Sequence, residues 1–245
     1  MEIKTHAKAL LLLVLGAGLG VVGSSFLSGK SGVSKSGAVG GTSAPLPAST
    51  ALDFFGTLGK LKTLKRTGWV NHGVDMPESV ADHMYRMSMM CFMLEDPTIN
   101  RDKLVKMCLV HDLAEAEVGD ITPENVSGVS KEDKRVLEEN AYRKIIDFLG
   151  ETPTNLTATG QELLDLWMEY EERSSLEAIV ASQLDKFEMI VQAEEYEIQH
   201  KFEKKLQSFF DSTEGYFKHK QIREWDKQLR ERRNIAWEKN ARMKK

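Results

Sequence analysis

Four side chains that can bind a metal ion stand in three separate apolar segments of this 245-residue chain. His83 lies in SVADHMYRM, the pair His111-Asp112 follows the apolar run MCLV, and Asp185 lies in SQLDKFEMI. A charged pair beside a core face is costly unless something compensates it, and a bound metal ion does so. Two imidazoles and two carboxylates suit Mn²⁺, Fe²⁺, Co²⁺ or Mg²⁺ better than structural zinc.

Each of these residues also has a purely structural interpretation. A single buried histidine is usually hydrogen-bonded in the core, and Asp185 alone could be a charge on a helix surface. Neighbours on a regular helix point about 100° apart, so His111 and Asp112 reach one ion only if it lies in the angle between them. The pattern therefore predicts a metal site in a groove between helices.

Helical periodicity dominates the chain after residue 50. Apolar residues recur near a 3.6-residue spacing, and no run alternates at period two for long enough to predict a strand. Pro77 suits the first turn of a helix, and Gly150 suits the residue after a helix end. We expect an all-α fold of about six or seven helices, over residues 52–65, 79–94, 101–118, 131–149, 161–173, 175–200 and 223–245.

Residues 1–50 differ in kind from the rest. Residues 9–27 are apolar, follow Lys4 and Lys8, and precede a stretch rich in Gly, Ser, Ala and Pro. This pattern resembles a secretory signal or signal anchor, and it is marginal as a membrane span. We interpret residues 1–27 as a signal, anchor or organelle-targeting segment of open destination, with a membrane tether through residues 9–27 as one alternative.

The remaining boundaries follow from this division. Residues 28–50 are predicted to be a flexible linker, residues 51–220 a soluble catalytic domain of intracellular type, and residues 221–245 a charged C-terminal helix or tail. Acids interrupt the basic residues of that tail, which favours a solvated helix over a nucleic-acid arm. The net charge of −4 likewise gives no reason to expect a nucleic-acid polymer as partner.

Other classes of chemistry lack their motifs. Cys91 and Cys108 have no CxxC spacing and are interpreted as buried free thiols in a reduced compartment. The chain has no GxxxxGK[ST] loop, no GxGxxG after a strand and no HExxH. Nucleoside triphosphatases, dehydrogenases and zincins are therefore not indicated.

The spaced set H…HD…D resembles the HD-domain metal-dependent phosphohydrolases. The runs PESVADHMYRM, LVHDLAEAEVGDITPEN and QLDKFEMIVQAEEYE resemble, more narrowly, the HD-domain 5′-deoxynucleotidases of eukaryotes. The resemblance covers residues 50–220 and implies an all-α helical bundle with a metal site between helices. It implies one or two divalent cations (Mn²⁺, Co²⁺ or Mg²⁺), a deoxyribonucleoside 5′-monophosphate as substrate, and a homodimer. The metal ligands that it implies are His83, His111, Asp112 and Asp185.

Two further acids match positions that this family uses beside the metal. Glu115 is four residues after His111, one helical turn along the same face. Asp120 follows Gly119, where we expect the helix to end, so its carboxylate can turn back over the metal, and the Ile121 carbonyl could add a ligand. We expect a water at the metal to attack the phosphate and Glu115 to handle the proton. Asp120 would orient the water or bind a second metal, and an acidic helix end is the structural alternative for both.

The run RTGW resembles the family's arginine–tryptophan element, in which arginine meets phosphate and tryptophan shapes the sugar pocket. Arginine suits bidentate phosphate recognition, and an indole against C2′ would exclude a ribose 2′-hydroxyl. The two residues are adjacent in the family pattern, whereas Thr67-Gly68 separates Arg66 from Trp69 here. The match therefore holds for Trp69 and stays open for Arg66. Thr122 and Pro123 match a loop that touches substrate in the family.

Alternative activities remain on the same scaffold. They are an HD phosphohydrolase acting on a cyclic nucleotide or guanosine tetraphosphate, a di-iron oxygenase, and a non-catalytic nucleotide-binding HD protein. A di-iron oxygenase would need further core histidines, for which only His72 is a candidate. A sensor would be expected to have lost ligands, so the intact set together with Glu115 favours catalysis.

Overall fold

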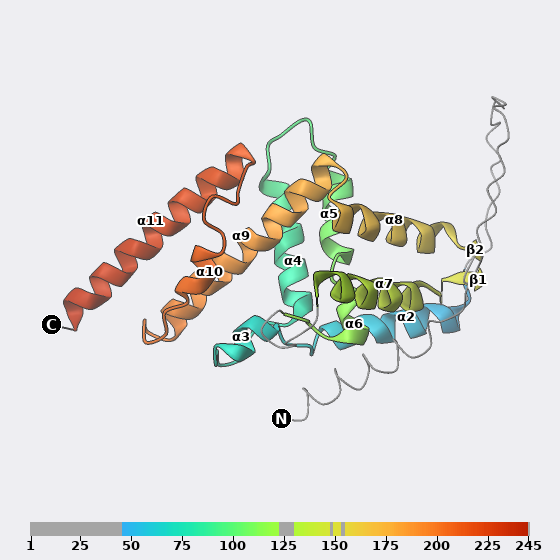
Figure 1. The fold of residues 1–245 in the computed structure, drawn as a ribbon, viewed down its shortest axis with the longest axis horizontal. Coiled ribbons are helices and arrows are strands. Elements are labelled where there is room, and N and C mark those ends of the chain that lie inside the picture. Colours follow the sequence, from blue (N-terminus) through green and yellow to red (C-terminus); the bar gives the residue numbers. More distant parts are fainter. Residues whose placement is uncertain (1–45, 123–129, 148, 153–154, 245) are drawn as a thin grey trace.

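The computed structural model describes residues 46–122, 130–147, 149–152 and 155–244. Apart from one small β-hairpin, the regular elements of this part are helices (Figure 1). The elements are α2 (Ala48–Leu61), α3 (Thr67–Asn71), α4 (Val80–Met90), η1 (Cys91–Met93), α5 (Arg101–Val110), α6 (Glu115–Val118), α7 (Lys131–Asp147), β1 (Gly150–Thr152), β2 (Asn155–Leu156), α8 (Ala158–Glu172), α9 (Leu176–Gln199), α10 (Gln207–Asp211) and α11 (Lys220–Met243).

The all-α class is confirmed, and seven helices of the described part have ten or more residues. The antiparallel pair β1–β2 is a small departure from the expectation of no strand. Strands of three and two residues are too short to show a period-two pattern. Gly150 begins β1 and is therefore not the residue that ends α7, so that expectation was wrong.

Helix α9 organises the molecule. It crosses α4 and α5 and also contacts α8, α10 and α11 (Figure 1). Its side chains Leu184 and Ile190 are fully buried, as are Met87 of α4 and Leu104 of α5. This shared core fixes α9 against α4 and the C-terminal end of α5, the three places that carry the predicted metal ligands.

The start of α4 is fixed by a capping box. The Ser79 hydroxyl accepts a hydrogen bond from the Asp82 backbone N–H at 3.1 Å, and the Asp82 carboxylate accepts from the Ser79 N–H at 2.8 Å. Pro77 lies before this cap and not in the first turn as expected. The cap sets the register of α4 one turn before His83, which points into the core and is fully buried.

The segment 101–118, predicted as one helix, is divided. Helix α5 ends at Val110, and tight turns follow in which Leu113 N–H donates to Val110 O at 3.2 Å and Glu115 N–H donates to Asp112 O at 3.1 Å. Helix α6 is then only four residues long and ends, as expected, at Gly119, whose φ of 78° suits glycine. Glu115 therefore reaches the site from a second helix start and not from a continuous helix face.

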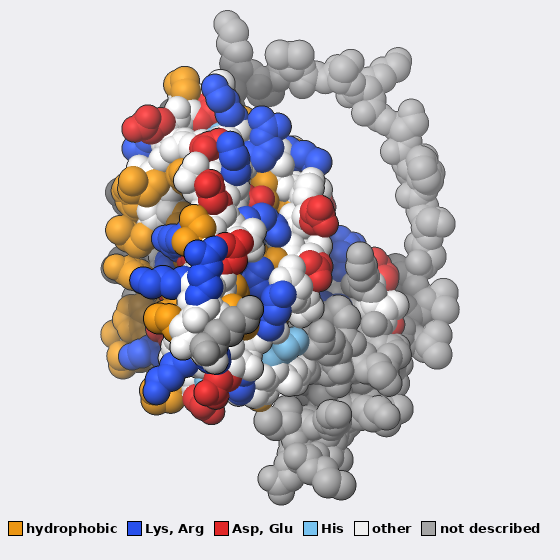
Figure 2. Space-filling view, turned by 90° about the vertical axis from the view of Figure 1, so that its left-hand side faces the viewer, with side chains coloured by type: hydrophobic (Ala, Val, Ile, Leu, Met, Phe, Trp, Pro, Cys, Tyr) orange, Lys and Arg blue, Asp and Glu red, His pale blue; other side chains and the backbone are white. Residues whose placement is uncertain are grey.

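The C-terminal helix α11 is joined to α9 by a buried ion pair. Figure 2 looks onto the side of the molecule where α11 lies and shows Lys and Arg mixed with Asp and Glu. Beneath this surface, the Arg233 guanidinium donates to both carboxylate oxygens of Glu197, from Nε at 2.7 Å and from Nη2 at 2.8 Å. Trp237 Nε1 adds a hydrogen bond to the same carboxylate at 2.8 Å. The helix is therefore packed on α9 and is not only a solvated tail.

The N-terminal apolar segment, residues 9–27, lies outside the described residues. Helix α2 begins at Ala48, inside the stretch expected to be linker. Within the part of the chain that the structure describes, no helix combines the length and the hydropathy of a membrane span.

We predict that Arg233→Ala lowers the free energy of unfolding by about 3–5 kcal/mol, because it leaves the buried Glu197 carboxylate without its cation. Urea denaturation followed by circular dichroism measures the change. Arg242→Ala is the matched control, since Arg242 pairs with Glu238 on the exposed surface at 3.5 Å and should change stability by less than about 0.5 kcal/mol. Equal effects of the two substitutions would contradict the prediction.

Candidate active site

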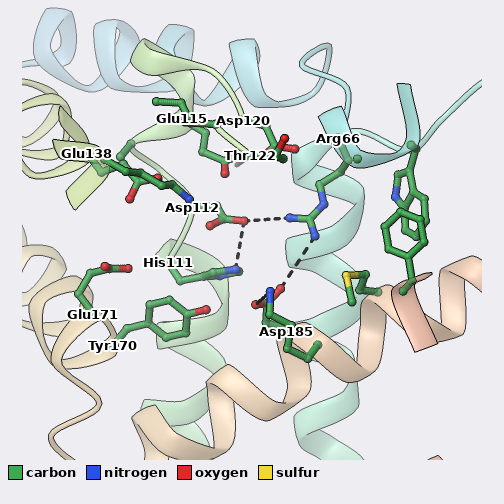
Figure 3. Close-up of a pocket in the computed structure, with 18 residues that line it drawn as sticks. Arg66, His111, Asp112, Glu115, Asp120, Thr122, Glu138, Tyr170, Glu171 and Asp185 are labelled. Carbon is green, nitrogen blue, oxygen red and sulfur yellow. Dashed lines mark hydrogen bonds and ion pairs between the residues drawn. The ribbon is translucent and has the colours of Figure 1, made fainter. Parts of the chain in front are cut away.

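Most of the predicted site residues line a cavity of about 270 Å³ between the helices, and His83 lies behind the lining, beside Asp185 (Figure 3). Its lining comes from the start of α3, the turns between α5 and α6, the residues after α6, α7, the end of α8, α9 and α10. Of the predicted residues, the lining contains Arg66, Trp69, His111, Asp112, Glu115, Asp120, Ile121, Thr122 and Asp185. Pro123 lies outside the described residues.

The predicted metal ligands meet at one place. His83, His111 and Asp185 each offer a ligand atom, and these atoms lie within 4.8 Å of one another. His83 Nε2 is 3.3 Å from Asp185 Oδ1, and His111 Nε2 is 3.2 Å from Asp112 Oδ2. Three helices far apart in sequence thus bring two imidazoles and two carboxylates together.

Both imidazoles are held with Nε2 facing this cluster. His111 Nδ1 donates to the Cys108 carbonyl at 2.9 Å, and His83 Nδ1 is hydrogen-bonded to the Glu188 carboxylate. Each Nε2 is buried and makes no well-aligned hydrogen bond, although the Asp185 and Asp112 carboxylates lie close to them. Buried nitrogens without a well-aligned partner are unusual in a folded protein, and a hydrogen bond from Nδ1 to a carboxylate or carbonyl is typical of a metal-binding histidine. The donor set therefore fits a divalent cation.

Glu188 is a site residue that the sequence reasoning missed. Its side chain is fully buried and also accepts a hydrogen bond from Arg86 Nε at 2.7 Å. Arg86 is three residues after His83, and Glu188 is three residues after Asp185. This pair of equal helical spacings was the available signal, because residues three apart share a helix face.

The carboxylates around His83 change its protonation. Burial and the Arg66 guanidinium lower the pKa of His83, but Glu188 and Asp185 outweigh them and raise it to about 9. Burial alone would raise the pKa of Asp185, yet Lys186, His83 and Arg66 hold it well below its usual range. Asp185 is therefore a carboxylate beside an imidazolium at neutral pH.

The Arg66 side chain lies beside the predicted metal ligands Asp112 and Asp185. Its Nη1 is 3.4 Å from Asp112 Oδ2 and its Nη2 is 3.9 Å from Asp185 Oδ1 (Figure 3). The backbone explains this position: the Arg66 N–H donates to the Glu78 carbonyl at 3.1 Å, and Arg66 is the residue before α3. The two-residue separation from Trp69 thus still leaves both side chains on the cavity.

Trp69 forms a rigid apolar wall. It is 1% exposed, its Nε1 donates to Glu78 Oε1 at 2.9 Å, and its ring packs on Phe209 at 4.4 Å and on Tyr196 at 5.3 Å between centroids. Phe209, which the sequence reasoning did not single out, also lines the cavity. It comes from the five-residue helix α10, which is too short to give a periodic pattern.

Glu115 at the start of α6 and Asp120, Ile121 and Thr122 after it line the cavity. Glu115 Oε2 and Thr122 Oγ1 are buried without a hydrogen-bond partner. Burial first, and then the Asp112 and Asp120 carboxylates, raise the pKa of Glu115 well above its usual range. Asp120 Oδ2 accepts from the Thr67 N–H at 2.6 Å, and Thr67 Oγ1 donates to the Asp120 carbonyl at 2.8 Å. Asp120 is therefore tied to the start of α3 by two bonds.

A second, polar wall was not expected from the sequence. It is formed by Lys134 and Glu138 of α7 and by Tyr170 and Glu171 of α8. Lys134 Nζ lies 3.2 Å from Glu138 Oε1, an i,i+4 pair of the kind that covers many helix surfaces. Burial raises the pKa of Glu138 to about 7, although Lys134 opposes it. Spacing alone could not distinguish this pair from a solvated one.

The chain is similar to known proteins over most of its length. Residues 58–225 match the model of a family described as HD domain. The chain is 52% identical over 182 residues to 5′-deoxynucleotidase HDDC2 of Dictyostelium discoideum, covering 70% of this chain and 92% of that protein. It is 47% identical over 176 residues to 5′-deoxynucleotidase HDDC2 of Homo sapiens, covering 71% and 82%. A solved conserved hypothetical protein from Pyrococcus furiosus has a TM-score of 0.60 at 29% identity, covering 74% of this chain and 99% of that one.

We predict that binding of a divalent cation releases a proton at neutral pH. His83 has a pKa of about 9 in the metal-free protein, so below that pH a proton must leave before Nε2 can bind a cation. Apparent affinity should therefore rise roughly tenfold per pH unit between pH 7 and 9 and level off above. Mn²⁺ titration calorimetry in buffers of different ionisation enthalpy counts the protons.

Glu188→Gln provides the comparison for this measurement. Loss of the negative charge on Glu188 should lower the pKa of His83 and move the pH at which proton release ends downward. Mn²⁺ binding at pH 7 without proton release from the wild-type protein would be incompatible with the protonation state described here.

Proposed function

This chain belongs to the HD-domain family, and we infer that it is a 5′-deoxynucleotidase, a phosphoric monoester hydrolase of deoxyribonucleoside 5′-monophosphates. Relatives named for that activity match it over most of their length. The observation that supports the inference for this molecule is that the buried Nε2 atoms of His83 and His111, neither of which makes a well-aligned hydrogen bond, converge with the Asp185 and Asp112 carboxylates beside the cavity. Such a donor set is arranged for a cation and not for core packing.

His83, His111, Asp112 and Asp185 would hold a divalent cation, with Mn²⁺, Co²⁺ and Mg²⁺ as the candidates. Bound there, it would neutralise a phosphate dianion and lower the pKa of a water molecule. If a second cation binds, Glu115, Asp120 and the Ile121 carbonyl would hold it, and the role of Glu115 as a base applies to the site with one cation. The buried Glu115 oxygen that lacks a partner supports this assignment.

Side chains of this chain supply the remaining chemistry. Arg66 would bind the phosphate, a role supported by its planar guanidinium, which lies at the cluster and lines the cavity. Glu115 has a raised pKa, which suits a carboxylate that takes a proton from the attacking water. The unpartnered Thr122 hydroxyl would donate to substrate, and Pro123 follows it in sequence.

Trp69 would select the sugar. Its indole is fixed by Glu78, Tyr196 and Phe209, so it cannot move aside for an added 2′-hydroxyl. A rigid apolar wall against C2′ accepts a methylene and excludes a hydroxyl that would lose its water.

An exposed apolar face supports a homodimer, the assembly that the family resemblance implies. Tyr85, Met89, Phe92 and Met93 follow one side of α4 and η1 and are 65%, 47%, 54% and 65% exposed. Hydrophobic side chains also gather along one edge of the molecule in Figure 2. A two-fold contact with a second copy would cover this face, because the same patch then meets itself.

Phosphate release from dAMP and AMP tests the activity. Metal-stripped full-length protein should release no phosphate, and added Mn²⁺, Co²⁺ or Mg²⁺ should restore phosphate release from dAMP. Asp112→Asn should lower kcat by at least roughly 100-fold. Asp165→Asn on the exposed side of α8 is the matched control and should behave as wild type. Wild-type protein that binds Mn²⁺ and releases no phosphate from either nucleotide would exclude the proposed activity.

Trp69→Phe extends the same assay to the sugar. The smaller ring should raise activity on AMP relative to dAMP by roughly tenfold, while dAMP hydrolysis stays within a few-fold of wild type. An unchanged ratio between the two substrates would remove Trp69 as the selecting residue.

We predict that Phe92→Glu converts the dimer into a monomer, because two like charges would meet in an apolar contact. Sedimentation equilibrium at micromolar protein gives the mass. Phe55→Glu, at an exposed phenylalanine of α2 (60% exposed), is the control and should leave the dimer intact. A wild-type protein that is monomeric throughout would remove the dimer proposal.

A further inference from the structure

Lys134 of α7 is a cation at the cavity that no role described above uses. Among the described residues that line the cavity, Arg66 and Lys186 are the other two Lys or Arg side chains. Lys186 Nζ lies 3.2 Å from Asp185 Oδ2, so, like Arg66, it already neutralises a carboxylate of the metal cluster. Lys134 is instead paired with Glu138, which lies outside that cluster.

The position of this pair defines a second side of the cavity. Glu138 and Glu171 lie on the other side of His111 and Asp112 from Arg66 (Figure 3). The cavity therefore has an apolar wall at α3 and α10 and a charged wall at α7 and α8.

The two walls would play different parts in the hydrolysis of a phosphate ester, and this part of the inference rests on the proposed function. The attacking and leaving oxygens lie roughly in line on opposite sides of phosphorus. In the proposed complex, a deoxynucleoside against Trp69 and Phe209 would direct its leaving oxygen toward the apolar wall. The attacking water would then lie away from that wall, and the non-bridging oxygens would be within reach of the cavity-lining cations Arg66 and Lys134.

We propose that Lys134 is a phosphate-binding residue: its ammonium contacts a non-bridging oxygen of the 5′-phosphate, opposite Arg66, and then holds the phosphate product while the deoxynucleoside departs. The side chain is suited to this movement. It is 38% exposed, whereas Glu138 is 12% exposed. A flexible lysine stem can therefore pivot about a nearly buried partner between the resting ion pair and the phosphate.

The surrounding charges keep Lys134 cationic. Burial lowers the pKa of its ammonium, but Glu138, Asp112 and Glu115 outweigh burial and raise it. The same carboxylates keep the ammonium near the cavity when no phosphate is present. An incoming phosphate dianion would therefore meet the Lys134 ammonium already at the edge of the cavity.

Inorganic phosphate is the probe for this role. Titration calorimetry on Mn²⁺-loaded full-length protein should give a phosphate Kd that is roughly tenfold or more weaker in Lys134→Gln, since a charged hydrogen bond is lost. Lys134→Arg should restore most of the affinity, and the Mn²⁺ affinity should not change. Lys144→Gln is the matched control on α7, because Lys144 pairs with Glu117 at 2.7 Å and is absent from the cavity lining. Its phosphate Kd should equal that of wild type.

Kinetics on dAMP separates this inference from the proposed function. KM should rise in Lys134→Gln, and phosphate should weaken as a product inhibitor by the same factor as its Kd. A folded Lys134→Gln with wild-type phosphate binding overturns the inference, and so does a fall in Mn²⁺ affinity. If phosphate binding depends on Lys134 but the wild-type protein is inactive on dAMP, the phosphate-binding role of Lys134 is supported and the proposed 5′-deoxynucleotidase activity is overturned. Lys134→Met, which keeps the length of the stem, replaces Lys134→Gln if the latter unfolds.

Discussion

The hydrogen bond between the Glu188 carboxylate and His83 Nδ1 is the interaction on which the site depends. It joins α9 to α4 inside the core, where neither group has access to water. Because the Nδ1 atom of His83 is bonded to Glu188, its second ring nitrogen, Nε2, points toward Asp185 and His111. The bond thus determines at once how two helices pack and which nitrogen is offered to a cation.

Helix α9 forms further pairs between acidic and basic side chains on two of its faces. Asp185, Glu188 and Glu195 recur at helical spacing toward α4, where Arg86 donates to Glu188 and, at 2.7 Å, to Glu195. Glu197, on another face, meets Arg233 of α11. Since buried charges are tolerated only when paired, the fully buried acids Glu188 and Glu197 each require their partner helix to be in place. The metal cluster is therefore supported by the folding of the whole bundle.

The sequence was most informative where a polar residue interrupts an apolar helix. His83, His111-Asp112 and Asp185 stood out for that reason, and the structure brings them together. Gly119 was predictable as a helix end, because only a residue that accepts positive φ fits there. Glu188 and Lys134 could not be distinguished from surface charges, since their burial and partners depend on helices distant in sequence. Phe209 belongs to a helix too short for periodicity, and the tight turns after Val110 have no marker residue.

The two bonds between Thr67 and Asp120 have a consequence for substrate binding. They join the start of α3, where Arg66 and Trp69 lie on either side of Thr67, to Asp120, the second residue after α6. The conformational entropy of these joined residues is therefore lost when the protein folds and not when a ligand arrives. A pocket preorganised in this way retains more of its contact energy as affinity, and it discriminates by shape because it does not adapt to what enters.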